Sequence, residues 1–155
     1  MNILIISNLY EPYARGGAEV VVKRTAQALL RQGHGVTVLT AGPYEGRSSL
    51  RVRETMQESV RVLRYYPLNI FFYPNDGKHS LPVRLLWHAF DLCNRHTARI
   101  VRQVLGKGSY DLVITHNLMG LGFSIPREIR RAGIKHIHVL HDIQLAVRSG
   151  LMRIG

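Results

Sequence analysis

The sequence predicts an α/β protein with a doubly wound, Rossmann-like parallel sheet, in a single domain that spans residues 1–155. Two observations predict this class. Apolar and β-branched runs typical of strands buried on both faces recur at 3–6, 36–40 and 111–115. Amphipathic segments with helical spacing separate such runs, the longest of them from 82 to 105. Strands that alternate with helices in this way pair in parallel, with helices on both faces of the sheet.

The first part of the chain predicts a strand, a helix and a second strand. Residues 3–6 form the first strand, and Gly16 and Gly17 open a helix in which apolar side chains recur at helical spacing. The glycine-rich segment 33–35 ends that helix, and residues 36–40 form the second strand. Because βαβ crossovers are right-handed in nearly all proteins, the two strands should lie side by side and parallel.

The next stretch is less regular. Residues 44–58 are polar and arginine-rich, so we expect a surface loop, whereas 59–65 alternates apolar and polar residues as a half-exposed strand does. The aromatic segment 70–73 has two interpretations. It could be an interfacial patch that meets a membrane, helped by neighbouring basic residues, or it could fill the groove between the sheet and a helix. The neighbouring basic residues are Arg61, Arg64, Lys78 and Arg84.

The last part of the chain repeats the alternation. Residues 82–105 predict one long helix with a break near Asn94, and 111–115 predicts another buried strand. A loop and a helix follow over 118–131, with glycines near the start and after the end. The last strand is expected at 135–140.

Composition limits the partners and the compartment. The chain carries 21 Lys and Arg against 10 Asp and Glu, a net charge of +11, which favours anionic partners. A membrane surface ranks first and nucleic acid is not expected, because the arginines are scattered rather than gathered on one recognition helix. Cys93 is the only cysteine, so no internal disulfide can form. With no apolar run long enough for a signal sequence or a membrane span, we expect a cytoplasmic protein, in peripheral contact with the inner face of the membrane.

The glycine pair is the first candidate site. Two residues without a Cβ let the main chain approach a ligand closely, and the free N–H groups of a first helical turn attract an anion such as phosphate. The alternative is that Gly16 and Gly17 only make the turn into the helix. Neither G-x-G-x-x-G nor G-x-x-x-x-G-K-[ST] is present, so a dinucleotide fingerprint and a P-loop are both excluded.

Three polar stretches follow predicted strands. They are the loop that ends at Gly17, the pair His116 and Asn117, and the pair His141 and Asp142. In doubly wound sheets ligands bind beyond the carboxyl ends of the strands, where the strand order reverses. We therefore expect these three stretches to face one crevice.

Four segments, taken together and in this order, resemble the N-terminal, acceptor-side domain of a GT-B glycosyltransferase of the large retaining family 4 type. The segments are Gly16-Gly17-Ala18-Glu19, the run from Leu29 to Thr40, the run from Asp111 to Asn117, and His138-Val139-Leu140-His141-Asp142. The resemblance implies transfer of a sugar, with retention of configuration, from a nucleotide-sugar donor to a saccharide or lipid-linked acceptor. It implies polysaccharide or glycolipid biosynthesis as the setting.

The resemblance also implies roles for individual residues. Gly16 and Gly17 would bind the donor diphosphate through backbone N–H groups, and His141 would contact the transferred sugar near the reacting carbon, oriented by Asp142. His141 and Asp142 are therefore the catalytic candidates. The acceptor-binding candidates are Tyr13, Arg15, Glu19, His116 and Asn117. We expect no metal and no cofactor, because the sequence lacks H-x-x-x-H and H-E-x-x-H spacings and the family needs no metal for its chemistry.

One part of the family pattern is absent from this sequence. The family's nucleotide-sugar pocket is built mostly by a C-terminal, donor-binding domain, and we expect a truncated N-terminal half that is inactive alone. A different class of function stays open, namely a non-catalytic module that binds a phosphate or a nucleotide.

Overall fold

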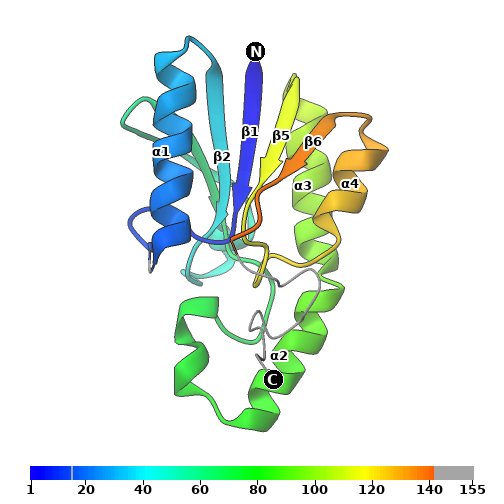
Figure 1. Ribbon diagram of the computed structural model, residues 1–155. Helices are drawn as coiled ribbons and strands as arrows, with labels where there is room; N and C mark the ends of the chain where they lie inside the picture. Colours follow the sequence, from blue (N-terminus) through cyan, green and yellow to red (C-terminus); the bar gives the residue numbers. More distant parts are fainter. Residues whose placement is uncertain (15, 142–155) are drawn as a thin grey trace, which may run out of the picture.

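One six-stranded sheet organises the protein in the computed structural model, which describes residues 1–14 and 16–141 (Figure 1). The strands lie in the order β3-β4-β2-β1-β5-β6. Their bounds are β1 (Asn2–Ser7), β2 (Gly35–Ala41), β3 (Arg53–Gln57), β4 (Val60–Tyr65), β5 (Leu112–Thr115) and β6 (Lys135–His138). Every neighbouring pair is parallel except β3 and β4. The predicted fold class is confirmed.

Helices cover both faces of this sheet. They are α1 (Gly17–Arg31), α2 (Leu81–Leu92), α3 (Arg95–Lys107) and α4 (Ile125–Arg131), with short 3₁₀ turns at Arg47–Leu50 and Tyr73–Lys78. Figure 1 shows α1 on one side of the sheet and α3 and α4 on the other. Helix α2 extends beyond the carboxyl ends of the strands, at the lower end of the view.

Alternating strand side chains supply two hydrophobic cores, because successive residues of a strand point to opposite faces. On one face Ile5 and Val38 pack with Val22 and Ala26 of α1. On the other face the strand residues pack with α3 and α4. The members from those two helices are Ile100, Val101, Val104, Leu105, Ile125 and Ile129. Both faces of the central strands are therefore buried, which accounts for their unbroken apolar runs.

The strand order reverses between β1 and β5. From β1 the chain moves outward to β2 and on to the β3–β4 hairpin at one edge of the sheet. It then returns to place β5 on the other side of β1, where Ile6 pairs with Thr115. This reversal is the topological switch point, beyond which α/β sheets bind their ligands. The carboxyl ends of β1 and β5 therefore define where a site is expected.

The structure corrects the interpretation of 44–58 as a surface loop. This segment contains β3, which pairs antiparallel with β4 and forms the edge of the sheet. The other boundaries are close to prediction. The long helix is broken into α2 and α3 at Cys93 and Asn94, as expected, whereas the helix predicted within 118–131 begins only at Ile125.

The aromatic segment 70–73 lies mainly inside the protein. Phe71 and Phe72 are buried, and the indole Nε1 of Trp87 donates to the carbonyl of Phe71 at 2.8 Å. The groove-filling interpretation is correct for these two rings. Exposed apolar side chains are found instead along α2, at Leu81, Leu85, Leu86 and Phe90. Within residues 1–14 and 16–141, no helix is both long enough and apolar enough to cross a membrane.

Candidate functional site

Backbone hydrogen bonds hold the ends of β1 and β5 together at the switch point. The amide of His116 donates to the carbonyl of Ile6 at 2.9 Å, and the amide of Asn8 donates to the carbonyl of Asn117 at 2.9 Å. The buried side chain of Asn8 then reaches across, with Nδ2 donating to the carbonyl of Met119 at 3.0 Å. The loop that carries His116 is thus fixed directly to the central strand.

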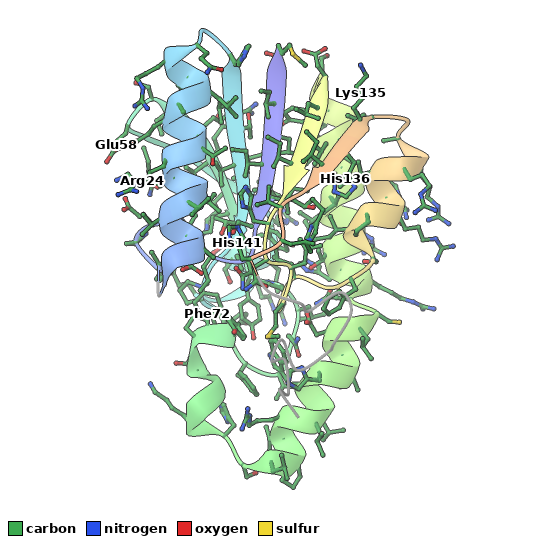
Figure 2. All side chains as sticks on the ribbon, in the orientation of Figure 1. Arg24, Glu58, Phe72, Lys135, His136 and His141 are labelled. Carbon is green, nitrogen blue, oxygen red and sulfur yellow. The ribbon has the colours of Figure 1, made fainter. Side chains whose placement is uncertain are left out.

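Two histidines from neighbouring strand ends meet here. His116 follows β5, and the amide of Val139 donates to the carbonyl of Thr115 at 2.8 Å, so the chain beyond β6 stays alongside β5. This pairing brings His141 to His116, whose Nδ1 lies 2.7 Å from Nε2 of His141. The expected convergence of the two histidine-bearing strand ends is therefore observed, with His141 near the lower ends of the central strands in the view (Figure 2).

The two rings differ in environment. His116 is 1% exposed, whereas His141 is partly exposed. Burial, together with the neighbouring His141 and His138, lowers the pKa of His116 to about 4, because removal from water disfavours the charged imidazolium. His116 is consequently neutral at physiological pH. Its Nε2 is buried and has no hydrogen-bond partner among residues 1–14 and 16–141.

A second histidine pair lies beside the first. The hydroxyl of Thr115 is 2.7 Å from Nε2 of His136 and 2.7 Å from Nδ1 of His138. A hydroxyl donates one hydrogen bond and can accept others, so it can satisfy one ring nitrogen as donor and the other as acceptor. Thr115 therefore ties the orientation of both rings on β6 to the end of β5. No three metal-ligating side chains gather suitably for a metal ion within the part of the chain that the structure describes.

Gly16 and Gly17 are exposed at the N-terminus of α1. This end of α1 lies at the same end of the sheet as the carboxyl ends of the strands (Figure 1). Neither needs to be glycine for its backbone conformation. Gly16 is extended, with φ −153°, and a Cβ added at Gly17 would meet no atom within 4 Å. The structure therefore shows no conformational or steric requirement for glycine in this turn.

Glu19 performs a local task in the same turn. Its buried carboxylate accepts a hydrogen bond from the amide of Gly16 at 2.7 Å, which caps α1 and places negative charge at the positive end of the helix. This contact occupies one of the two glycine amides expected to bind phosphate. An acceptor-binding role for Glu19 stays a prediction, and its side chain is engaged in the cap.

Tyr13 belongs to a small cluster at the same edge. Its ring meets Phe72 edge to face, with centroids 5.8 Å apart, and the guanidinium of Arg64 lies 5.4 Å from the Tyr13 ring centroid. Arg64 also donates from Nη2 to the carbonyl of Glu11 at 2.5 Å. Burial lowers the pKa of Arg64. The Nε atom of Arg64 is also buried, and it has no hydrogen-bond partner among the described residues. Arg64 thus places a cation at the carboxyl end of β4.

The remaining predicted site residues divide into two groups. Asn117 is partly exposed, and its Oδ1 accepts from the amide of Met119 at 3.0 Å, which makes it a turn-forming residue. Arg15 and Asp142 lie outside the described residues. The structure thus brings His116 and His141 into direct contact and puts the glycine pair on the same edge of the sheet.

Sequence reasoning missed Asn8 and Arg64 as site residues. Asn8 directly follows β1, so its position at the end of the first strand was the available signal. Arg64 is the last residue but one of β4. The chain is rich in arginine, and nothing in the sequence distinguishes Arg64 from the other arginines. Only the strand order places Asn8 at the switch point.

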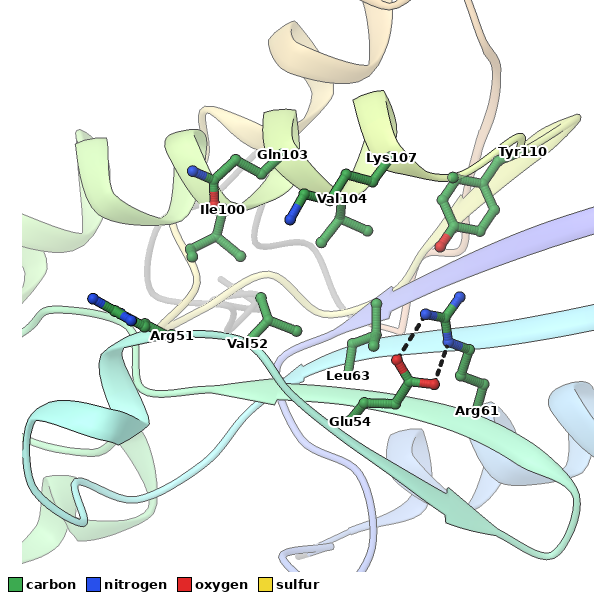
Figure 3. Close-up of a pocket in the computed structure, with 11 residues that line it drawn as sticks. Arg51, Val52, Glu54, Arg61, Leu63, Ile100, Gln103, Val104, Lys107 and Tyr110 are labelled. Atoms are coloured by element: carbon green, nitrogen blue, oxygen red, sulfur yellow. Dashed lines mark hydrogen bonds and ion pairs between the residues drawn. The ribbon is translucent and has the colours of Figure 1, made fainter.

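A separate hollow of about 530 Å³ lies between α3 and the β3–β4 hairpin (Figure 3). Apolar side chains face one another across it, with Ile100 and Val104 on α3 and Val52 and Leu63 on the opposite side. Arg51 and Lys107 also line the hollow, and Arg61 is paired with Glu54 at 2.7 Å. None of the crevice residues lines this hollow.

A family model described as a glycosyl transferase 4-like domain matches residues 16–154. The chain belongs to this family. The matched range includes the glycine pair, Gly16 and Gly17, and the two histidines at the strand ends, His116 and His141.

One relative matches nearly the whole chain. The sequence is 30% identical over 145 residues to a protein of Klebsiella pneumoniae described as an uncharacterized 42.6 kDa protein in cps region. The alignment covers 94% of this chain and 38% of the relative, so this glycosyl transferase 4-like chain spans well under half of that protein's length.

Solved structures share the fold. An Escherichia coli structure described as trehalose-6-phosphate bound with UDP-2-fluoro glucose is similar with a TM-score of 0.57 and 16% identity, over 97% of this chain and 36% of that one. A sucrose-phosphate synthase structure from Thermosynechococcus elongatus is similar with a TM-score of 0.56 and 14% identity, over 94% of this chain and 66% of that one. The C-terminal domain of the PF1911 hydrogenase from Pyrococcus furiosus has a TM-score of 0.54 and 18% identity, over 88% and 89% of the two chains. These likenesses show that the chain has a Rossmann-like α/β fold.

Proposed function

We propose that residues 1–155 form the acceptor-side half of an enzyme that transfers a sugar from a nucleotide-sugar donor, with retention of configuration. Membership of the glycosyl transferase 4-like family supports the reaction class. The E. coli structure described with UDP-2-fluoro glucose supports the donor class, and the Klebsiella relative's description supports polysaccharide or glycolipid biosynthesis. The acceptor is a saccharide or a lipid-linked saccharide.

The proposal gives each crevice residue a chemical task. The α1 N-terminus at Gly17 binds the donor diphosphate through backbone N–H groups, which stabilise the negative charge that develops on the leaving group. His141 contacts the transferred sugar. Tyr13 and Asn117 belong to the acceptor side, and Arg15 and Asp142 keep the roles predicted from the sequence. No metal and no cofactor is required, because helix amides supply the positive charge.

One observation carries the proposal: the two glycines are exposed at a helix N-terminus although neither backbone conformation requires glycine. What glycine adds there is room. A phosphate can come within hydrogen-bonding distance of main-chain amides only where no side chain stands in the way. The N–H groups of a first helical turn also lack intrahelical acceptors, so a ligand can satisfy them.

A substitution at Gly17 tests this. We expect Gly17→Leu to weaken binding of UDP-glucose about tenfold or more, a loss of about 1.4 kcal/mol, because the side chain blocks the approach to the amides. The measurement is an amide NMR titration of the chain with UDP-glucose. Gly106→Leu is the matched control, since a Cβ at Gly106 also meets no atom within 4 Å and lies on α3. Equal affinities of the two variants would contradict the diphosphate role.

Activity assays test the rest of the proposal. We expect residues 1–155 alone to bind donor weakly without turnover, whereas the natural gene product that carries them transfers sugar and preserves the anomeric configuration, as read by proton NMR of the product. Robust turnover by residues 1–155 would refute the incomplete-enzyme part. Donor binding by the gene product without transfer to any saccharide or lipid-linked acceptor would instead favour the non-catalytic binding module.

A peripheral contact with an anionic membrane also belongs to the proposal. Leu81, Leu85, Leu86 and Phe90 of α2 are 57–66% exposed, and α2 extends past the edge of the sheet that carries the crevice (Figure 1). No acidic residue occurs from 77 to 90, and the chain carries a net charge of +11. An apolar helix face in a cationic protein fits a bilayer with anionic head groups. Such a contact would bring the crevice close to a lipid-linked acceptor.

A further inference from the structure

The contact between His116 and His141 has a definite geometry. The joined nitrogens are 2.7 Å apart, the ring centroids are 5.0 Å apart, and the ring planes differ by 21°. Because the centroids lie much further apart than the nitrogens, the rings meet edge to edge and do not lie face on face. Ring N–H groups lie in the ring plane, so this arrangement is that of an N–H···N hydrogen bond.

The direction of this bond follows from the burial of His116. If His141 were the donor, a neutral His116 would carry its proton on Nε2, where a buried N–H would find no acceptor in the part of the chain that the structure describes. If His116 donates from Nδ1, its Nε2 is a bare acceptor instead. Buried N–H groups without a partner are rarer in folded proteins than buried acceptors without one. The second direction is therefore the more stable.

The charge state of His116 agrees with this direction. Burial and two neighbouring histidines keep its pKa near 4, so at neutral pH the ring holds one proton and has to place it on one of its two nitrogens. The amide of His116 donates to the carbonyl of Ile6 at 2.9 Å, and this bond fixes the backbone position from which the His116 ring extends. Protonation of both rings at once would leave His116 and His141 without an acceptor between them.

We infer that His116 is a positioning residue, which donates from Nδ1 to Nε2 of His141 and thereby holds His141 in the tautomer that carries its proton on Nδ1. His141 is the partly exposed member of the pair, and in this tautomer it offers an N–H donor to an oxygen atom of a ligand. The identity of that ligand as a sugar hydroxyl rests on the proposed function. Asp142, to which the family resemblance gives an orienting role, lies outside the described residues, and the hydrogen bond gives His116 an orienting role of its own.

The tautomers can be read directly in the chain, without donor or turnover. Long-range ¹H–¹⁵N correlation spectra distinguish a protonated ring nitrogen from a bare one. We expect both His116 and His141 to carry the proton on Nδ1 at pH 7.5. A His141 ring protonated on Nε2 would overturn the inference, because the bond would then run in the opposite direction.

Two variants of His116 separate positioning from packing. His116→Asn places an amide N–H close to the former Nδ1, and we expect His141 to stay protonated on Nδ1. His116→Leu fills similar space without a donor, and we expect His141 to shift toward the Nε2-protonated tautomer that free histidine prefers. Amide spectra check that both variants fold. Unchanged His141 tautomers in a folded His116→Leu variant would also overturn the inference.

Adding UDP-glucose separates this inference from the proposed function. A shift of the His141 Nδ1–H signal in wild-type protein and in His116→Asn, but not in His116→Leu, supports both. If the tautomers are as expected and UDP-glucose leaves the signal unchanged, the positioning role stands and the sugar contact of the proposed function fails. The wild-type tautomer alone decides the positioning role, even where a variant does not fold.

Discussion

The hydroxyl of Thr115 links the end of β5 to two histidine side chains of β6. Thr115 is fully buried, and its hydroxyl contacts ring nitrogens of His136 and His138, each at 2.7 Å. We expect Thr115→Val to lower the free energy of unfolding by about 1 to 2 kcal/mol, because both hydrogen bonds are lost at constant side-chain shape. Thr115→Ser, which keeps the hydroxyl, should lose less. Urea unfolding followed by circular dichroism measures both, and equal losses would contradict a role for the hydroxyl.

Asp91 makes the stability depend on pH. Its carboxylate is buried in α2 and accepts one hydrogen bond, from the amide of Gly120 at 2.9 Å, while its other oxygen has no partner. Burial raises the pKa of Asp91 to about 6 from the ordinary 3.8. Between these two pH values the folded state binds more protons than the unfolded state, so the free energy of unfolding falls as pH rises through this window.

Asp91→Asn removes this titration and therefore tests it. Between pH 5 and 7.5 the wild-type protein should lose about 1 kcal/mol of unfolding free energy relative to the variant, because between pH 5 and about 6 the folded protein still holds a proton that the unfolded chain has already lost. The quantity to compare is the difference between the two proteins at each pH, from urea titrations. Taking the difference cancels the contribution of His116, whose lowered pKa acts in the opposite direction. A difference that does not vary with pH would contradict the raised pKa.

At the scale of residues, the sequence predicts which polar side chains lie at the strand ends, but it does not predict the hydrogen bonds between them. His116 and His141 were expected at strand ends because polar residues follow apolar runs there. Their hydrogen bond could not be predicted, because it requires that β5 and β6 be neighbours in register, with Thr115 opposite His138. Glu19 was assigned to the acceptor, although its spacing from Gly16 is that of a helix cap.

At the level of elements, Asn94 explains why one predicted helix is two. Its Oδ1 accepts from the amide of Thr97 at 2.9 Å, so the side chain caps α3 directly after α2 has ended. We expect Asn94→Ala to lower the free energy of unfolding by about 1 kcal/mol, the usual loss for a helix cap. Asn94→Ser keeps an acceptor oxygen and should recover much of this loss. If both variants unfold at the same urea concentration, the cap is not what stabilises the break.

The strand that sequence reasoning missed shows where patterns fail. β3 is an edge strand with mostly exposed side chains, so no buried face imposes an alternating pattern on it. Its hairpin with β4 turns at Glu58 and Ser59, which have positive φ angles of 48° and 67°. Two-residue turns of this kind normally show Asn-Gly or Asp-Gly, and Glu58-Ser59 is neither. The central strands, buried on both faces, were predictable for the opposite reason.

For the whole molecule, the alternation of strands and helices was enough to predict the fold class, because only a parallel sheet buries apolar runs on both faces. It could not predict the distribution of apolar surface. Phe71 is buried against Trp87 of α2 and Phe72 is buried in the main core, whereas Leu85 and Phe90 of α2 are exposed. Helical spacing alone does not predict whether the aromatic segment 70–73 or the apolar side of α2 is buried and which of the two is exposed.

Charge and exposed apolar surface together give the last prediction, on membrane contact. We expect the chain to float with vesicles of phosphatidylcholine and phosphatidylglycerol at low salt and to stay in solution with pure phosphatidylcholine, because the net charge of +11 adds to burial of apolar side chains. The double variant Leu85→Gln/Phe90→Gln keeps the charge and removes two side chains that are 62% and 59% exposed, so it should lose most of the binding. Met56→Gln, at a residue 64% exposed on β3, is the control and should float like wild type. Wild-type protein that stays soluble at low salt, or a double variant that floats equally well, would exclude α2 as the membrane contact.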